Sequence, residues 1–337
     1  MIKHENKILN ETYYELTLDN GLKVFLMPKN DYYKTFAVFA TKYGSRDTEF
    51  IPLGEKEFIK TPEGIAHFLE HKLFENEDGT DVSNLFATFG ADANAFTTND
   101  MTSYLFSTTT EFDNNLELLL DFVQSPYFTK QGIDKERGII EQELLMYLDL
   151  PQNVQYFGIL KGMYKQNHIR NEIGGTIESI SEINEDLLYT CYNTFYHPSN
   201  MVLTIVGKFD LDNTIELIKN NQSKKIFETA QPIERKHFIE TEEVNQENSF
   251  IDMNINSIKV SIGLKVACEE LNNYDYMKKA ILLDMITDLY FNEASNDYEQ
   301  LIEEGIINNS FDFGSYFDKT YRHIIINLDT DEPEIFF

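Results

Sequence analysis

The stretch Thr61–Glu75 reads TPEGIAHFLEHKLFE, and the rest of the chain is organised around it. Thr61 is typical of a residue that caps a helix N-terminus. Pro62 suits the first helical position, where its missing N–H is not needed. The pattern therefore predicts a helix that begins at this point and continues through Phe74.

His67, Glu70 and His71 share one face of this helix, because residues three and four positions apart stack on one side. Two imidazoles at this spacing can bind one zinc ion, and a carboxylate beside them can hold the water that the metal acidifies. The pattern H-x-x-E-H is the reversed form of a zinc-protease signature. From this pattern alone, an exposed helix face with idle, solvated histidines stays an alternative.

The composition of the chain limits the kinds of molecule that we expect it to bind. The chain has 337 residues, of which 42% are hydrophobic, and a formal net charge of −29. This length can hold two domains, and the hydrophobic content argues against wholesale disorder. Nucleic acid and anionic membrane surfaces repel an acidic protein, so we expect neither as the main partner. No run approaches the ~18 apolar residues of a membrane span.

The N-terminus and the cysteines indicate the cellular compartment of the protein. The N-terminus, MIKHENKILNETYYEL, has no apolar region typical of a secretory signal. Cys191 and Cys268 are too few and too far apart for a disulfide framework, and Cys191 is interpreted as a core residue. We therefore expect a cytoplasmic protein. His168 and His197 are lone loop histidines that we do not expect to touch the metal.

Hydrophobic periodicity predicts the other elements. Strands are expected in a hairpin over 12–29, at 35–43, within 90–107 and at 200–206. Helices are expected at 82–89, 111–125, 134–148, 154–164, 181–195 and 212–220. After a polar stretch at 222–250 with at most one strand, we expect a strand at 257–266, helices at 274–291 and 297–304, and a strand at 322–328.

The helix predicted at 134–148 carries two carboxylates within its apolar stripe. Around the helix axis, Glu143 lies about 20° from Glu136, whereas Glu141 lies about 140° from it. An ionised carboxylate on a buried face is costly unless a cation or a donor meets it. Glu143 is therefore the expected third zinc ligand. Glu136 is a supporting or alternate carboxylate.

The stretch 90–107, GADANAFTTNDMTSYLFS, is predicted to be extended. Its small residues would let another backbone approach, so a peptide could bind there as an added strand. An ordinary hairpin with small turn residues is an equally good interpretation of this stretch alone.

Four stretches together resemble M16-type zinc peptidases, the family of insulinase, pitrilysin and mitochondrial processing peptidase. Within it, the chain most resembles the bacterial branch associated with elongation-factor-P aminopentanol modification. The resemblance covers most of residues 15–210 and is weaker beyond 250. The matching stretches are TPEGIAHFLEHKLFE, ADANAFTTNDMTSY, KERGIIEQELLMYLDLP and FYHPSNMVLTIVGKFD.

The resemblance implies a role for each matching residue. It implies that His67 and His71 are zinc ligands and that Glu70 is the general base. The family's third ligand falls on Glu143, seven positions after Glu136, in agreement with the helical phase.

The family's substrate-pairing edge strand falls on Asn94, Ala95, Phe96 and Thr97. The resemblance thereby favours strand addition over an ordinary hairpin.

The resemblance also implies an α+β fold of two related halves, each an antiparallel sheet with helices on one face. We expect a catalytic domain at 1–222, a linker at 223–250, and a partial second copy at 251–337, which lacks much of the length that relatives have.

The expected function is zinc-dependent endopeptidase activity, with one zinc ion per chain, on peptides or leader peptides held as an added β-strand. A related M16 subunit is the expected partner, in a homodimer or heterodimer. The main alternative is a non-catalytic scaffold or a partner-dependent subunit of a heterodimer. A purely structural zinc site is disfavoured, because such sites are commonly rich in cysteine and neither cysteine is near this helix in sequence.

Overall fold

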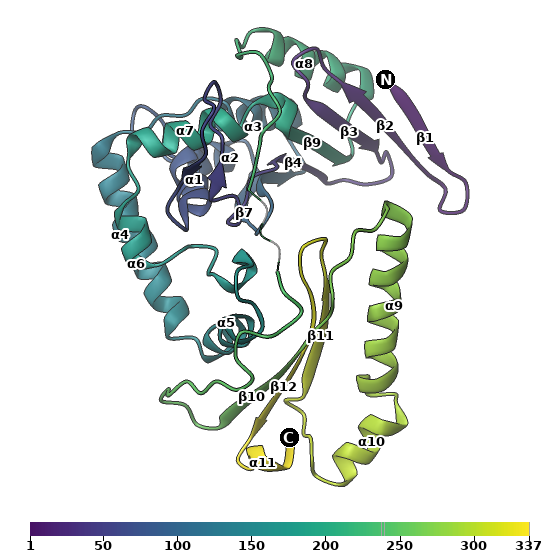
Figure 1. Cartoon of the computed structure of the whole chain (residues 1–337). Helices are drawn as coiled ribbons and strands as arrows, with labels where there is room; N and C mark the ends of the chain where they lie inside the picture. Colours follow the sequence, from purple (N-terminus) through teal and green to yellow (C-terminus); the bar gives the residue numbers. More distant parts are fainter. Residues whose placement is uncertain (237, 239, 337) are drawn as a thin grey trace. The chain divides into compact units, whose positions relative to one another are not determined.

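The structure, a computed structural model, describes residues 1–236, 238 and 240–336. The chain divides into two compact units (Figure 1). The first comprises Met1–Leu144 and Ile173–Lys236. The second comprises Leu145–Glu172 and the described residues after Lys236. Each unit has a main sheet of its own.

The first unit is built on a seven-stranded sheet with the order β1-β2-β3-β9-β4-β8-β7. Its strands are β1 (Ile2–Asn6), β2 (Glu11–Thr17), β3 (Lys23–Pro28), β4 (Thr35–Thr41), β7 (Ala91–Thr97), β8 (Thr102–Thr108) and β9 (Met201–Gly207), and a separate pair comprises β5 (Glu49–Phe50) and β6 (Ile59–Lys60). Neighbouring strands are antiparallel except β3 and β9, which are parallel. The sheet is therefore mixed, and the prediction of an antiparallel sheet was wrong here. The long connection between β3 and β9, over residues 29–200, permits their parallel pairing.

The helices of this unit complete an α+β fold, as the sequence predicted. Helix α1 (Ile65–Leu73) packs on β7 and β8. Helix α2 (Val82–Thr88) packs on β7, and helix α3 (Phe112–Val123) packs on β4 and β8. Along β9, Met201, Leu203 and Ile205 are buried and alternate with half-buried residues, so one sheet face carries the core. The helices are α1 (Ile65–Leu73), α2 (Val82–Thr88), α3 (Phe112–Val123), α4 (Lys130–Leu148), α6 (Ile177–Ser181), α7 (Glu185–Phe195) and α8 (Leu211–Ser223), with a 3₁₀ turn η2 (Pro198–Asn200).

The second unit has a smaller, three-stranded antiparallel sheet with the order β10-β12-β11. Its elements are α5 (Pro151–Met163), η1 (His168–Arg170), β10 (Ile258–Lys265), α9 (Asn273–Phe291), α10 (Asn296–Glu303), β11 (Asp312–Phe317), β12 (Arg322–Thr330) and α11 (Pro333–Phe336). Helix α5 packs on β10, and α9 packs on β11. No helix among the described residues is long and apolar enough to cross a membrane.

Most of the predicted elements are confirmed, with boundaries shifted by a few residues. Strands β1 and β11 were missed, because IKHEN and DFGSYF lack a clear apolar alternation. Within its described residues, the polar stretch 223–250 contains one bridge residue, Arg235, and no strand.

Candidate metal centre

Helix α1 begins after Gly64, three residues later than the sequence predicted. Gly64 has a φ of 86°, in the left-handed region that favours glycine. A Cβ atom at this position would lie 2.2 Å from the carbonyl oxygen of Gly174. Thr61 is buried, and its hydroxyl donates to the carbonyl of Thr48 instead of capping the helix. The prediction of a Thr61 N-cap was therefore wrong.

Three side chains from α1 and α4 meet at one point. His67 Nε2 lies 3.8 Å from Glu143 Oε1, and His71 Nε2 lies 3.6 Å from Glu143 Oε2. One ligand atom from each of the three residues lies within 4.8 Å of the others. The two imidazole rings stand edge to face, with centroids 4.6 Å apart. The tertiary fold thus brings together residues that are 76 positions apart in sequence.

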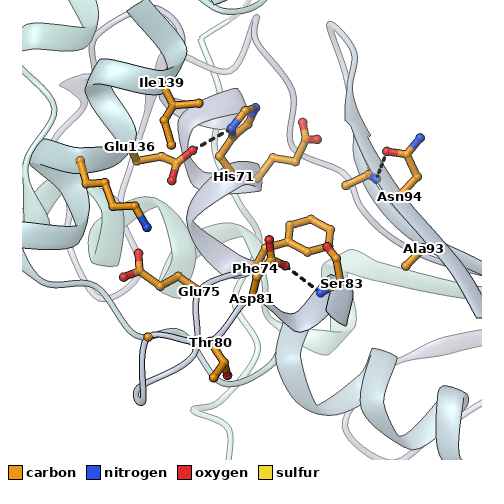
Figure 2. A pocket seen from close by; sticks show the side chains of 14 residues that line it. His71, Phe74, Glu75, Thr80, Asp81, Ser83, Ala93, Asn94, Glu136 and Ile139 are labelled. Carbon is orange, nitrogen blue, oxygen red and sulfur yellow. Dashed lines mark hydrogen bonds and ion pairs between the residues drawn. The ribbon is translucent and has the colours of Figure 1, made fainter. Parts of the chain in front are cut away.

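Glu136 orients His71 from the far side of its ring. His71 Nδ1 lies 3.0 Å from Glu136 Oε1 (Figure 2). An ionised carboxylate can only accept a hydrogen bond, so Nδ1–H donates; in the neutral ring Nε2 then carries the lone pair beside Glu143. Glu141, the remaining glutamate of this stretch, lies outside the cluster of possible ligands.

The two histidines differ in their charge preference. Burial, followed by the charge of neighbouring His71, lowers the pKa of His67 to about 3, so His67 is neutral. At His71, burial acts to lower the pKa, but the hydrogen bond to Glu136 and the charges of the nearby glutamates outweigh it. The pKa of His71 is therefore raised overall; these glutamates are Glu70, Glu136 and Glu143. His71 thus lies in a site that favours positive charge.

Glu70 is buried beside this cluster and is held by the end of strand β7. The hydroxyl of Thr97 donates a hydrogen bond of 2.5 Å to Glu70 Oε2. Burial raises the pKa of the Glu70 carboxyl, and the Thr97 bond partly offsets that shift. The result is a carboxylate of raised basicity with one oxygen fixed in position.

The donor set fits a zinc ion. The distances between the histidine nitrogens and Glu143 are too long for hydrogen bonds. Zinc bonds of about 2.0–2.2 Å in a tetrahedral arrangement would separate ligand atoms by roughly 3.4 Å, close to what is observed. Burial keeps His67 neutral and the carboxylates around His71 favour a positive charge, so a cation between the three side chains suits the site. The pairing of two histidines with one glutamate is also a zinc ligand set found in peptidases.

Strand β7 forms the sheet edge next to this cluster. Asn94 is exposed, Phe96 is 41% exposed, and Ala95 is half-buried. The backbone N–H of Ala95 donates to the side chain of Asn94, so it points away from the neighbouring strand. Thr97, the fourth predicted substrate residue, is instead buried against Glu70.

A cavity of about 350 Å³ lies between His71, one member of the cluster, and this edge (Figure 2). His71 and Glu136 lie at one end, and Asn94 of β7 lies at its side. Its wall is polar near Glu75 and apolar near Phe74. The lining residues are Glu70, His71, Phe74, Glu75, Gly79, Thr80, Asp81, Ser83, Ala93, Asn94, Ala95, Lys135, Glu136 and Ile139.

Sequence reasoning missed the loop that supports α1. Besides the Gly64–Gly174 contact, a Cβ on Gly175 would lie 2.5 Å from the carbonyl of Glu63. The Ser179 hydroxyl donates to that same carbonyl. The dipeptide Gly174-Gly175 was the available signal, although a glycine pair indicates a turn and not its contact partner.

Among the described residues, the cluster of possible ligands includes neither of the two loop histidines. His197 bonds through Nδ1 to Ser199 and through Nε2 to the carbonyl of Glu228. The ring of His168 packs on Phe238 in the second unit.

Comparison with known proteins agrees with this geometry. The profile of the family described as "Insulinase (Peptidase family M16)" matches residues 53–177. The profile described as "Peptidase M16 inactive domain" matches residues 182–335. An uncharacterized zinc protease of Bacillus subtilis, YmfH, is 45% identical over 98% of this chain and 77% of its own length.

Solved structures agree as well. An M16-like peptidase from Alicyclobacillus acidocaldarius superposes with a TM-score of 0.91 at 35% identity, over 99% of this chain and 77% of that chain. A protease from Helicobacter pylori shares the fold, with a TM-score of 0.79 at 19% identity over 96% of this chain and 78% of that chain. Profile, sequence and structure therefore agree: the chain belongs to the M16 (insulinase) family of zinc metalloproteases.

Proposed function

We propose that this chain is a zinc-dependent endopeptidase that holds its peptide substrate as an added strand on β7. The observation that carries this proposal is the meeting of His67, His71 and Glu143 beside the buried carboxylate of Glu70. A structural zinc site would need no such base. It would also commonly draw on cysteine ligands.

His67, His71 and Glu143 would hold one zinc ion per chain. When bound there, zinc lowers the pKa of a water molecule and polarises a carbonyl group. The hydrogen bond from His71 to Glu136 keeps the ring in the tautomer whose Nε2 is free to bind metal. Burial keeps His67 neutral, so one nitrogen of its ring has a lone pair that can bind metal.

Glu70 is the proposed general base. Its raised pKa suits a group that takes a proton from the attacking water and later delivers it to the leaving amine. Thr97 holds one carboxylate oxygen, which leaves the other oxygen available for the water.

The substrate would lie extended along Asn94, Ala95, Phe96 and Thr97. Main-chain hydrogen bonds to β7 would set its register, because the N–H of Ala95 already points outward. The cavity between β7 and the cluster is large enough for one side chain next to the scissile bond. Thr97 then links the substrate strand to the base.

The test is Glu70→Gln, assayed with an unbiased peptide library and with metal analysis of the same preparation. We expect about one zinc per chain and a loss of cleavage of at least 100-fold, since general-base catalysis contributes about 10²–10⁴-fold. Glu141→Gln, on α4 but outside the cluster, is the matched control and should stay active. Undiminished hydrolysis by zinc-loaded Glu70→Gln would exclude this role for Glu70.

The resemblance of the sequence to M16 peptidases also supports proposals for the domain bounds and the branch of the family. We propose a catalytic domain at 1–222, a linker at 223–250 and a partial second copy at 251–337. We also propose membership of the branch associated with elongation-factor-P aminopentanol modification. A reducing, cytoplasmic setting suits the two free cysteines.

We further propose a related M16 subunit as partner. The main sheet of the second unit has three strands, whereas that of the first unit has seven, which favours dependence on an added subunit. If the chain binds zinc but cleaves peptides only after a related subunit is added, the partner-dependent form of the proposal is correct. A zinc-free protein that is inert in both conditions would favour the scaffold alternative.

A further inference from the structure

The two histidines of the metal centre differ in what holds the far side of each ring. His71 Nδ1 donates a hydrogen bond of 3.0 Å to Glu136 Oε1 (Figure 2). His67 Nδ1 is buried and has no hydrogen-bond partner in the part of the chain that the structure describes. A histidine that binds metal almost always donates through its other ring nitrogen to a carboxylate, a carbonyl or a water. His71 therefore has the usual arrangement, and His67 is the exception.

The unpartnered nitrogen of His67 is a hydrogen-bond donor. Nε2 of this ring lies 3.8 Å from Glu143 Oε1 and is therefore the nitrogen that faces the third ligand. A neutral imidazole that binds metal through Nε2 carries its hydrogen on Nδ1. A buried donor without an acceptor is costly, and an acceptor at this position would raise the basicity of the ring toward the metal.

Gly174 is the residue beside this nitrogen. A Cβ atom on Gly174 would lie 3.5 Å from His67 Nδ1 and 3.8 Å from His67 Cε1. A short polar side chain at this position could therefore reach Nδ1, and glycine offers none. Close backbone contacts fix the loop here, because a Cβ on Gly64 would meet the carbonyl of Gly174 and a Cβ on Gly175 would meet that of Glu63.

We propose that the metal centre is asymmetric, with His71 as its firmly held ligand and His67 as its weakly held one, and that Gly174 sets this difference. Gly174 is a positioning residue, since it acts on the metal only through the ring of His67. The proposal rests on the zinc site of the proposed function. It implies that the fold could bind zinc more tightly than this sequence does.

A packing role for Gly174 is the alternative. A Cβ on Gly174 would lie 2.9 Å from Leu144 Cδ2, the end of a flexible side chain that would have to shift. Alanine and serine bring the same Cβ and the same contact, and only serine adds a hydroxyl that can accept a hydrogen bond from His67 Nδ1. Gly174 is not among the glycines with positive φ, so its backbone can accommodate both residues.

The experiment compares Gly174→Ser with Gly174→Ala in the 337-residue chain. We expect the serine variant to bind zinc about tenfold more tightly than the alanine variant in competition with a chelator, the lower end of the usual 10- to 100-fold effect of such a partner. The absorption spectrum of bound cobalt(II) should also differ between the two variants. Thermal unfolding of the two metal-free proteins should coincide, because the hydroxyl acts on the ring that binds metal.

Gly138→Ser is the matched control, because a Cβ on Gly138 of α4 would have no neighbouring atom within 4 Å. It should bind zinc as the unmodified chain does. If the contact with Leu144 disturbs folding, the same serine and alanine variants are compared in a Leu144→Val background, which removes the Cδ2 atom.

Equal zinc affinities of the Gly174→Ser and Gly174→Ala variants would overturn the proposal and leave packing as the role of Gly174. An equal gain in Gly138→Ser would overturn it too, since the gain would then not depend on His67. Neither measurement needs peptidase activity. A chain that binds zinc but cleaves no peptide would count against the proposed function, and the order of affinities would still decide this inference.

Discussion

The hydroxyl of Thr97 donates a 2.5 Å hydrogen bond to the carboxylate of Glu70. Thr97 ends edge strand β7, and Glu70 lies on α1 between the two histidines of the cluster. This bond couples the strand proposed to bind substrate to the group proposed to move the proton. We therefore expect a substrate that shifts β7 to shift the proposed base as well.

We expect Thr97→Val to lower kcat by about 10- to 100-fold. A lost hydrogen bond to a charged group costs about 1.5–3 kcal/mol, and each 1.4 kcal/mol is tenfold in rate. Zinc content should stay unchanged, because Thr97 is not among the grouped ligands. Thr97→Ser keeps the hydroxyl and should keep most of the activity. Equal losses in the Val and Ser variants would show that the hydrogen bond is not the cause.

Glu136→Gln should weaken zinc binding by about 10- to 100-fold, the usual effect of removing a group that orients a ligand. The amide still reaches His71 Nδ1 but no longer carries the charge that favours Nδ1–H as donor. Competition with a chelator measures the affinity. Glu141→Gln is the control on the same helix, and an equal loss of affinity there would contradict a specific role for Glu136.

Gly64→Ala should destabilise the first unit more than Gly79→Ala does. Both glycines have positive φ values, 86° and 78°, so both substitutions carry the left-handed strain of about 1 kcal/mol. Only at Gly64 would the new Cβ meet backbone, 2.2 Å from the Gly174 carbonyl, whereas Gly79 faces open space. We expect an additional loss of roughly 2 kcal/mol or more in the free energy of unfolding. Equal melting temperatures for the two variants would contradict the close contact.

Stability of the second unit should fall as the pH is lowered from about 6.5 to 4. Burial lowers the pKa of His323 to about 4, below its value of about 6.5 in an unfolded chain. In this window the unfolded state takes up a proton that the folded state does not, so acid favours unfolding, by about 3 kcal/mol at most. Burial raises the pKa values of the neighbouring Tyr164 and Tyr316 hydroxyls, so both rings stay uncharged over this range.

The check is urea unfolding of the chain and of His323→Phe across that pH range. The Phe variant should lose this part of the pH dependence. The hydroxyl of Tyr164, which bonds to His323, can still donate to the Arg322 carbonyl. An unchanged pH dependence in the variant would assign it to other groups.

Helical phase indicated Glu143 on the assumption that a buried apolar stripe surrounds it, and that burial is only partial. Ile140 is buried, but Ile139 is 49% and Tyr147 is 37% exposed. The angle between Glu143 and Glu136 was nevertheless informative, because backbone geometry fixes direction even where burial is incomplete.

By itself, the sequence determined the spacing of His67, Glu70 and His71, the helix that carries them, and most strands and helices. These features are local, because hydrogen bonding within a helix and periodic burial act over a few residues. Only the tertiary structure decided that α1 begins at a contact between Gly64 and Gly174, that Thr97 bonds to Glu70, and that β9 pairs in parallel with β3. Those features depend on which distant segments pack together, and no local pattern specifies a packing partner.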